Sequence, residues 1–152
     1  MVITFLGHRL VPPGDRLIPR IKDVLLSRIG DTDEVTFYCG GYGDFDRLCA
    51  QVCRSIKKDR GRCELVYITP YITEAQQKKV AAFLDDGLYD SVLYPPLEHI
   101  PPRFSILHRN EWMVSNADTV LAYVRTSYGG AYRGLLYAKK LGKDIINLAE
   151  SR

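Results

Sequence analysis

The chain carries three short glycine-containing turns of the kind that bind phosphate groups. Each follows an apolar run typical of a β-strand, and two of them lead directly into a helix. Glycine lets backbone approach an anion closely, and a helix N-terminus adds free N–H groups and partial positive charge. In any one turn, the glycines also suit a tight turn without a ligand. The three turns are Gly7-His8-Arg9, Gly40-Gly41-Tyr42-Gly43-Asp44 and Ser127-Tyr128-Gly129-Gly130.

Charged side chains near these turns allow more than one interpretation. Arg109 either pairs with a phosphate in a bidentate manner or is a solvated surface residue. Met113 lies one helical turn later, so an inward-packed Met113 would turn Arg109 toward the glycine turns. Asp44 and Asp46 suit the cap of the following helix. Because a carboxylate repels a phosphate placed over it, we expect Asp46 to orient its loop or to bind a ribose hydroxyl.

These considerations define a set of candidate ligand-binding residues, drawn from the three turns, from the segment around Arg109 and from the last helix. They are Gly7, His8, Arg9, Gly40, Gly41, Tyr42, Gly43, Asp44, Asp46, Arg109, Asn110, Met113, Ser127, Gly129, Gly130 and Arg133. We assign no catalytic residue and expect neither a metal nor a cofactor. Cys49 and Cys53 lie one helical turn apart, but without a CxxC pair or nearby histidine they are predicted to be buried thiols, like Cys39 and Cys63.

The spacing of apolar residues predicts the elements that position these turns. The strands are expected at Val2–Leu6, Val35–Cys39, Cys63–Thr69, Thr119–Val124 and Asp144–Leu148. They are continuous apolar runs separated by helices, which indicates a buried parallel sheet. We predict an α/β fold, a single Rossmann-like domain over residues 1–152, with a mainly parallel five-stranded sheet in the order 3-2-1-4-5 and helices on both faces. Ser91–Tyr94 would add a short edge strand.

Composition narrows the classes of partner. The chain has 152 residues, is 46% hydrophobic and 26% charged, and carries a formal net charge of +3. This modest charge, without a basic run, argues against a nucleic-acid partner and suits a small anionic ligand. No apolar run approaches the ~20 residues of a membrane span, so we expect no membrane partner. The beginning of the chain shows a strand and no signal peptide, and we expect reduced thiols and a cytoplasmic location.

Several motifs resemble the SLOG superfamily. Thr4-Phe5-Leu6-Gly7-His8-Arg9 resembles the opening strand and turn of its YpsA-like branch, and the turn within Cys39–Asp46 resembles one shared by that branch and the DprA proteins. The stretch from His108 to Leu148 is similar in layout to the Lonely-Guy phosphoribohydrolases. The resemblance covers nearly all of the chain except Pro70 to Pro102. It implies a Rossmann-like fold, binding of nucleotides or nucleotide-derived signals, and self-association into a homo-oligomer.

The same resemblance bears on catalysis. The related hydrolases use an arginine before the fourth strand and a glutamate in the pattern GGxGTxxE. Arg109 matches the arginine, but Leu136 occupies the glutamate position and cannot stabilise an oxocarbenium ion. We therefore predict that the protein binds or senses a nucleotide or nucleotide-derived ligand without turning it over.

Two further hypotheses remain open at this point. One is an N-glycosidic hydrolase or nucleoside transferase acting on a nucleoside monophosphate, with Asp44, Asp46 or Glu111 as a relocated carboxylate. The other is single-stranded DNA binding by analogy with DprA, against which the modest charge speaks.

Overall fold

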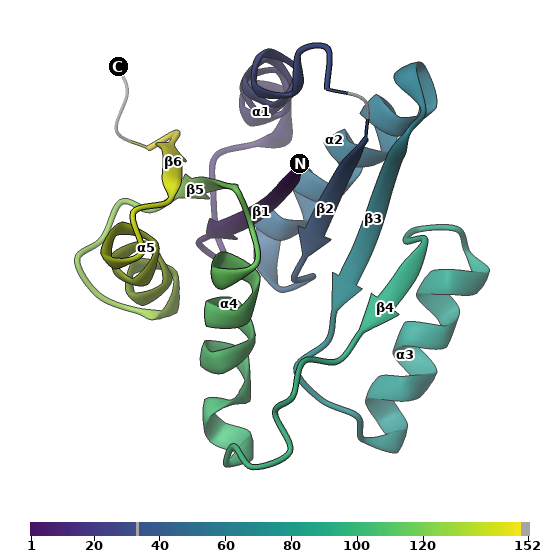
Figure 1. Cartoon of the computed structure of the whole chain (residues 1–152), viewed down its shortest axis with the longest axis vertical. Helices are drawn as coiled ribbons and strands as arrows, with labels where there is room; N and C mark the ends of the chain where they lie inside the picture. The colour runs from purple at the N-terminus through teal and green to yellow at the C-terminus, as the bar shows by residue number, and fades with distance from the viewer. Residues whose placement is uncertain (33, 150–152) are drawn as a thin grey trace.

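The computed structural model describes residues 1–32 and 34–149, and within these residues six parallel strands form one sheet (Figure 1). The strands are β1 (Val2–Gly7), β2 (Val35–Cys39), β3 (Cys63–Ile68), β4 (Ser91–Leu93), β5 (Thr119–Tyr123) and β6 (Asp144–Asn147). Their order is β4-β3-β2-β1-β5-β6. The Rossmann-like class and the relative order of the five expected strands are confirmed. The sheet has six strands because Ser91–Leu93 pairs with the edge of β3.

Helices connect these strands and cover both faces of the sheet (Figure 1). They are α1 (Gly14–Ile29), α2 (Gly43–Arg60), α3 (Glu74–Asp85), α4 (Ser105–Ser115) and α5 (Gly130–Lys140). The first three pack on one face, where α1 buries Leu17, Ile21, Leu25 and Ile29 at helical spacing. The other two pack on the opposite face, where Leu135 and Ala138 of α5 contact the strands. This arrangement follows from right-handed crossovers between parallel strands.

Local sequence accounts for the helix boundaries. The hydroxyl of Thr73 accepts a hydrogen bond of 3.3 Å from the backbone N–H of Gln76, as its capping-box spacing predicts. The sequence also predicts a helix from about Arg103 to Asn116, and the observed helix, Ser105–Ser115, is shorter. Residues Pro102–Phe104 form a 3₁₀ turn instead, next to two prolines that lack N–H donors. The α4 helix therefore begins at Ser105, close to the carboxyl edge of the sheet.

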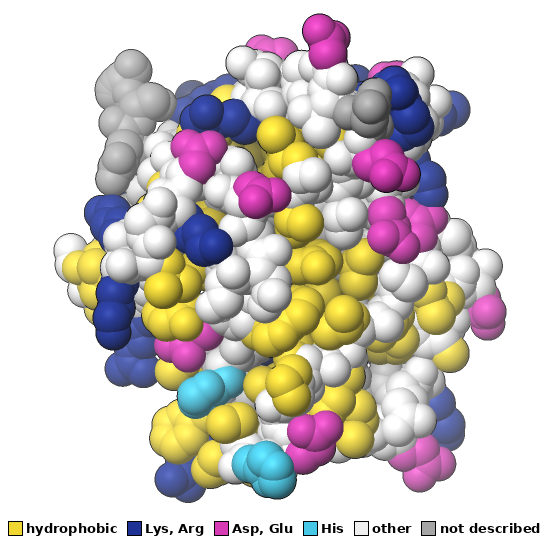
Figure 2. All heavy atoms as spheres, in the orientation of Figure 1, with side chains coloured by type: hydrophobic (Ala, Val, Ile, Leu, Met, Phe, Trp, Pro, Cys, Tyr) yellow, Lys and Arg dark blue, Asp and Glu magenta, His cyan; other side chains and the backbone are white. Residues whose placement is uncertain are grey.

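One part of the sheet surface is not covered by a helix. Hydrophobic side chains run down the middle of the face in Figure 2, between α4 and β4. Tyr38, Leu93 and Trp112 are partly buried there, against Val66 and Met113. Within the described residues, α4 is thus the helix that packs closest to this part of the sheet.

Candidate functional site

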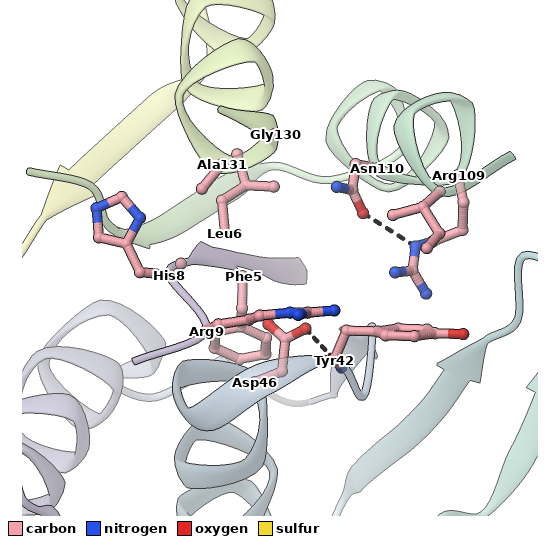
Figure 3. A pocket seen from close by; sticks show the side chains of 12 residues that line it. Phe5, Leu6, His8, Arg9, Tyr42, Asp46, Arg109, Asn110, Gly130 and Ala131 are labelled. Atoms are coloured by element: carbon pink, nitrogen blue, oxygen red, sulfur yellow. Dashed lines mark hydrogen bonds between the residues drawn. The ribbon is translucent and has the colours of Figure 1, made fainter. Parts of the chain in front are cut away.

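A cavity of about 370 Å³ lies where the chain leaves β1, at the carboxyl edge of the parallel sheet (Figure 3). This edge is where open parallel sheets bind ligands, near the point at which successive connections diverge to opposite sides. Here the chain passes from β1 toward β2 on one side, whereas β5 lies on the other side of β1. The cavity is lined by Phe5, Leu6, Gly7, His8, Arg9, Tyr42, Asp46, Ile106, Arg109, Asn110, Gly130 and Ala131.

Arg109 is a fully buried cation that joins α4 to the sheet. Its side chain is 1% exposed, and one guanidinium nitrogen, Nη1, donates to the carbonyl oxygens of Gly40 at 3.0 Å and Ile68 at 2.6 Å. Nε donates to Oδ1 of Asn110 at 3.0 Å. Burial lowers the pKa of Arg109, and the neighbouring Asp46 carboxylate opposes this change. The guanidinium also lies 5.4 Å from the ring centroid of Tyr42. The interpretation of Arg109 as a solvated residue is therefore wrong.

Asp46 orients the turn between β2 and α2. Its Oδ2 accepts a hydrogen bond of 2.9 Å from the backbone N–H of Tyr42, the residue that precedes α2. This contact confirms the expectation that Asp46 orients its loop. Burial raises the pKa of Asp46 to about 6, even though Arg109 and the Tyr42 N–H both favour the ionised form. Asp46 is consequently a half-buried carboxylate that ionises near neutral pH and faces a cavity.

His8 and Arg9, on the loop after β1, have different roles. Nε2 of His8 accepts a hydrogen bond of 2.8 Å from the backbone N–H of Arg125, which ties the loop after β1 to the loop after β5. Burial and the nearby Arg125 lower the pKa of His8, which favours the neutral form that accepts this bond. Arg9 is exposed at the cavity, and within residues 1–32 and 34–149 no carboxylate lies within 4 Å of its guanidinium. It is therefore available to an anion.

The last turn presents the N-terminus of α5 to the cavity. Gly129 precedes the helix with φ 92°, and Gly130 and Ala131 begin it and line the cavity. Residues Ser127, Gly129 and Arg133 are exposed and lie outside the cavity lining. Tyr128, at the tip of the turn, is 75% exposed. The beginning of α5 thus supplies backbone N–H groups beside the two arginines.

The structure brings together only part of the predicted set. Gly7, His8, Arg9, Tyr42, Asp46, Arg109, Asn110 and Gly130 line the cavity, whereas Gly40, Gly41, Gly43, Asp44, Met113, Ser127, Gly129 and Arg133 do not. Of the six glycines in the three turns, Gly7 and Gly130 therefore line this cavity and the other four do not. Gly41 and Gly43 face a different hollow beside Phe83 and Tyr89. Met113 packs inward against Val66 and Ile68, and this inward packing turns Arg109 toward the β2–α2 turn as expected.

Close packing explains why some of the glycines are needed without a ligand. A Cβ on Gly41, whose φ is +70°, would lie 2.4 Å from the ring of Tyr67, and one on Gly7 would lie 2.2 Å from Phe45. The tight-turn interpretation therefore applies to Gly41. A Cβ on Gly130 would meet nothing within 4 Å, so its space is open to the cavity.

Sequence reasoning missed the apolar walls of the cavity. Phe5, Leu6, Ile106 and Ala131 line it, although each belongs to an apolar pattern that also predicts a core position. The only sequence signal for these apolar walls was in α4. Ile106 lies three residues before Arg109 and therefore shares its helix face. The structure also bears on the hydrolase alternative, which the comparisons do not support. Leu136 is 45% exposed and lies outside the cavity, and among the three candidate carboxylates only Asp46 lines it.

Cys39, Cys49, Cys53 and Cys63 are free and buried, as predicted, and burial raises the pKa of Cys49 and Cys53 well above the usual value. Among the residues that the structure describes, no three His, Cys, Asp or Glu side chains are grouped so as to hold a metal ion. The helices of the described part of the chain are all too short or too polar to cross a membrane.

An all-parallel sheet with helices on both faces defines a Rossmann-like fold. Two solved structures share this fold. DNA processing protein A from Helicobacter pylori, which binds single-stranded DNA, is 16% identical and superposes with a TM-score of 0.63, covering 99% of this chain and 68% of that chain. DNA processing protein A (DprA) from Streptococcus pneumoniae is 14% identical with a TM-score of 0.62, covering 94% of this chain and 48% of that chain.

No protein-family model and no curated protein matches the sequence. The chain spans about half of the length of the Streptococcus protein. At these identities the likeness shows the fold alone.

The comparisons also correct two expectations. A sensor of a small nucleotide-derived ligand, and the exclusion of a nucleic-acid partner, both conflict with the single-stranded DNA binding of the Helicobacter neighbour. The physical reason for the error is that the net charge of +3 averages over the whole surface. It does not report how cations are distributed, and within the described residues several arginines at the carboxyl edge have no carboxylate within 4 Å.

Proposed function

We propose that the protein binds single-stranded DNA along the carboxyl edge of its sheet, across the cavity that contains Arg9 and Arg109. The observation that carries this proposal is the combination of unneutralised arginines and exposed aromatic rings at one edge. Proteins that bind single strands without a base-specific code combine a cationic surface, which follows the phosphates, with aromatic side chains on which bases stack. The carboxyl edge of this sheet contains both components.

The cationic component comes from loops and helix ends that meet at this edge. Arg9, Arg103, Arg125 and Arg133 lie on the loop after β1, before α4, on the loop after β5 and in the first turn of α5. In the part of the chain that the structure describes, none of them has a carboxylate within 4 Å. The N-terminus of α5 adds backbone N–H groups for a phosphate. Several phosphates of one strand can therefore be contacted at once.

The stacking component comes from side chains that are otherwise unexplained. Tyr128 is 75% exposed on the loop after β5, and Phe104 is 40% exposed beside the guanidinium of Arg103. Leu10, on the loop after β1, is 83% exposed. Exposed aromatic rings beside arginines are the side chains on which unstacked bases of a single strand stack. Unstacked bases of a single strand are a partner that suits both the rings and the arginines.

Four finer assignments belong to the same proposal. The motif Gly7-His8-Arg9 favours the YpsA-like branch of the superfamily, and the turn at Gly129-Gly130 is proposed as a phosphate-binding loop. A role with DNA is compatible with a cytoplasmic protein, and we keep that location as a proposal. Ser127 and Arg133, which are exposed outside the cavity, are proposed to contact the strand there.

The proposal is tested by the salt dependence of binding to a fluorescein-labelled dT12 oligonucleotide, followed by fluorescence anisotropy. Arg9→Ala should weaken binding about tenfold at 0.1 M salt, in the range for one lost charge-assisted hydrogen bond. It should also reduce the slope of log affinity against log salt concentration by about 0.7, which is the contribution of one phosphate contact on a single strand.

The matched control is Arg28→Ala. It removes the same charge at the opposite edge of the sheet, where Arg28 lies 3.2 Å from Asp144 in an exposed ion pair. This control should leave both affinity and slope unchanged. Equal effects of the two substitutions would show a diffuse charge effect, and absence of dT12 binding by the unaltered protein would reject the proposal.

A further inference from the structure

We infer that the cavity accepts one unstacked base of the bound strand and selects guanine through Asp46 and Asn110. This inference rests on the proposed function and concerns the chemistry of the same site. A cavity of about 370 Å³ is near the lower limit of small-molecule pockets, which run from about 300 to 1,000 Å³. It suits a single base, and the rest of the strand would lie across the exposed arginines.

The apolar walls show that the cavity suits more than a phosphate group. Phe5, Leu6, Ile106 and Ala131 contribute aromatic and aliphatic surface to its lining. In Figure 3, Leu6, Gly130 and Ala131 lie on one side of the cavity, and Asp46 and Tyr42 lie on the other. A phosphate alone would gain nothing from these apolar groups, whereas the flat faces of a base would bury them.

Asp46 supplies the hydrogen-bond acceptors. Its Oδ2 accepts from the Tyr42 N–H, and within the described residues no donor lies within hydrogen-bond distance of Oδ1. An ionised carboxylate has about four lone-pair sites, so it can accept further hydrogen bonds from a ligand. Its negative charge repels phosphate from the interior and favours a neutral group that carries N–H donors.

Asn110 supplies the complementary donor, and its orientation is fixed by Arg109. A guanidinium only donates, so the atom of Asn110 that faces Nε of Arg109 at 3.0 Å must be the carbonyl oxygen Oδ1. The amide nitrogen Nδ2 is therefore directed away from Arg109, and Figure 3 shows it on the cavity side. The cavity thus presents a carboxylate acceptor and an amide donor.

Guanine is the DNA base that matches this pair. Its Watson–Crick edge has two adjacent donors, N1–H and N2–H, next to the acceptor O6. A carboxylate can accept from both donors at once, while an amide N–H reaches O6. Adenine and cytosine each offer a single amino group on that edge, and thymine offers one N–H between two carbonyl groups. Each of these three would leave part of the Asp46 carboxylate unpaired in a half-buried position.

The experiment compares 12-mers of sequence T5-X-T6 by competition against labelled dT12, with X as dG, dA, dC, dT or deoxyinosine. The oligonucleotide with dG should bind about tenfold more tightly than those with dA, dC or dT, which is within the discrimination of a bidentate base contact. Deoxyinosine lacks the N2 amino group and should lie between dG and the others. Asp46→Asn and Asn110→Asp should each reduce the dG-to-dT affinity ratio to about one.

The matched control is Asp44→Asn, the same change on the same helix at a residue outside the cavity, and it should keep the ratio. Equal binding of all five oligonucleotides would overturn the inference while the proposed function stands. A preference for another base, or a dG preference that persists in both cavity variants, would also overturn it. Failure of every oligonucleotide to bind would reject the proposed function and the inference together.

Discussion

Arg109 and Asp46 carry opposite charges at the cavity, and burial affects their ionisation differently. Arg109 keeps its charge because two backbone carbonyls and Asn110 accept its hydrogen bonds. Asp46 accepts a hydrogen bond from one backbone N–H, that of Tyr42 at 2.9 Å, and burial raises its pKa to about 6. Removing Arg109 would leave the carbonyls of Gly40 and Ile68 unpaired, so its replacement by alanine would disturb folding as well as binding. Asp46 is the better residue for separating the two effects.

We expect Asp46→Asn to stabilise the protein at pH 8 and to have little effect near pH 4. The ordinary carboxyl pKa of about 3.9 applies to the unfolded chain, whereas the folded value is about 6. Between these values the folded state binds more protons, so stability falls as the pH rises through that window and then levels off. Because Asp46 is half-buried, we expect the substitution to raise the free energy of unfolding at pH 8 by about 1–2 kcal/mol, as measured by urea unfolding. A difference independent of pH would contradict this account.

The turn between β2 and α2 shows how one element combines packing with function. Asp44 donates its backbone N–H to the Arg9 carbonyl at 2.8 Å, and Gly43 lies so close that a Cβ would come within 2.7 Å of the Arg9 Cα. The loop that holds Arg9 is therefore fixed by the start of α2. In the third turn, by contrast, Gly130 faces open space. Glycines that look alike in the sequence serve the fold in one turn and leave room for a ligand in another.

Alanine substitutions should separate these two uses of glycine. Gly41→Ala should lower the free energy of unfolding by about 2–4 kcal/mol, because φ is +70° and the added Cβ would lie 2.4 Å from Tyr67. Gly130→Ala should be neutral or stabilise by up to about 1 kcal/mol, since alanine favours helix more than glycine does. It should nevertheless weaken dT12 binding. Urea unfolding and anisotropy measure both effects, and similar destabilisation by the two substitutions would contradict the distinction.

The elements could be predicted from the sequence because apolar periodicity and caps are local signals. The runs at Val2–Leu6 and Val35–Cys39 become β1 and β2 within one residue. The structural and the ligand-related roles of the turn glycines could not be distinguished from the sequence. The sequence does not show which aromatic ring packs against a given glycine. Tyr67 lies 26 residues after Gly41, and only the sheet brings the two together.

At the scale of the whole molecule, the site depends on contacts between distant segments. Arg109 reaches Gly40 across 69 residues, and His8 reaches Arg125 across 117. The prediction of strand order was enough to place the turns after β1, β2 and β5 at one edge. The sequence did not show how the cations are distributed over the surface. A net charge of +3 is the same for an evenly charged surface and for one with a cationic edge. The expected class of partner was wrong for that reason.

The uneven distribution of cations predicts which segments bound DNA would protect from amide hydrogen exchange. Amide hydrogen exchange with and without saturating dT12 should slow in residues 8–13, 40–44 and 124–131, which form the carboxyl edge around the cavity. The connections at the amino edge, residues 60–62 and 141–143, should exchange at unchanged rates. The loops after β1 and β5 should respond together, because the bond from the Arg125 N–H to His8 couples them. Protection centred on the partly exposed apolar face at Tyr38 and Trp112 would instead place the DNA on the sheet surface and contradict an edge-on site.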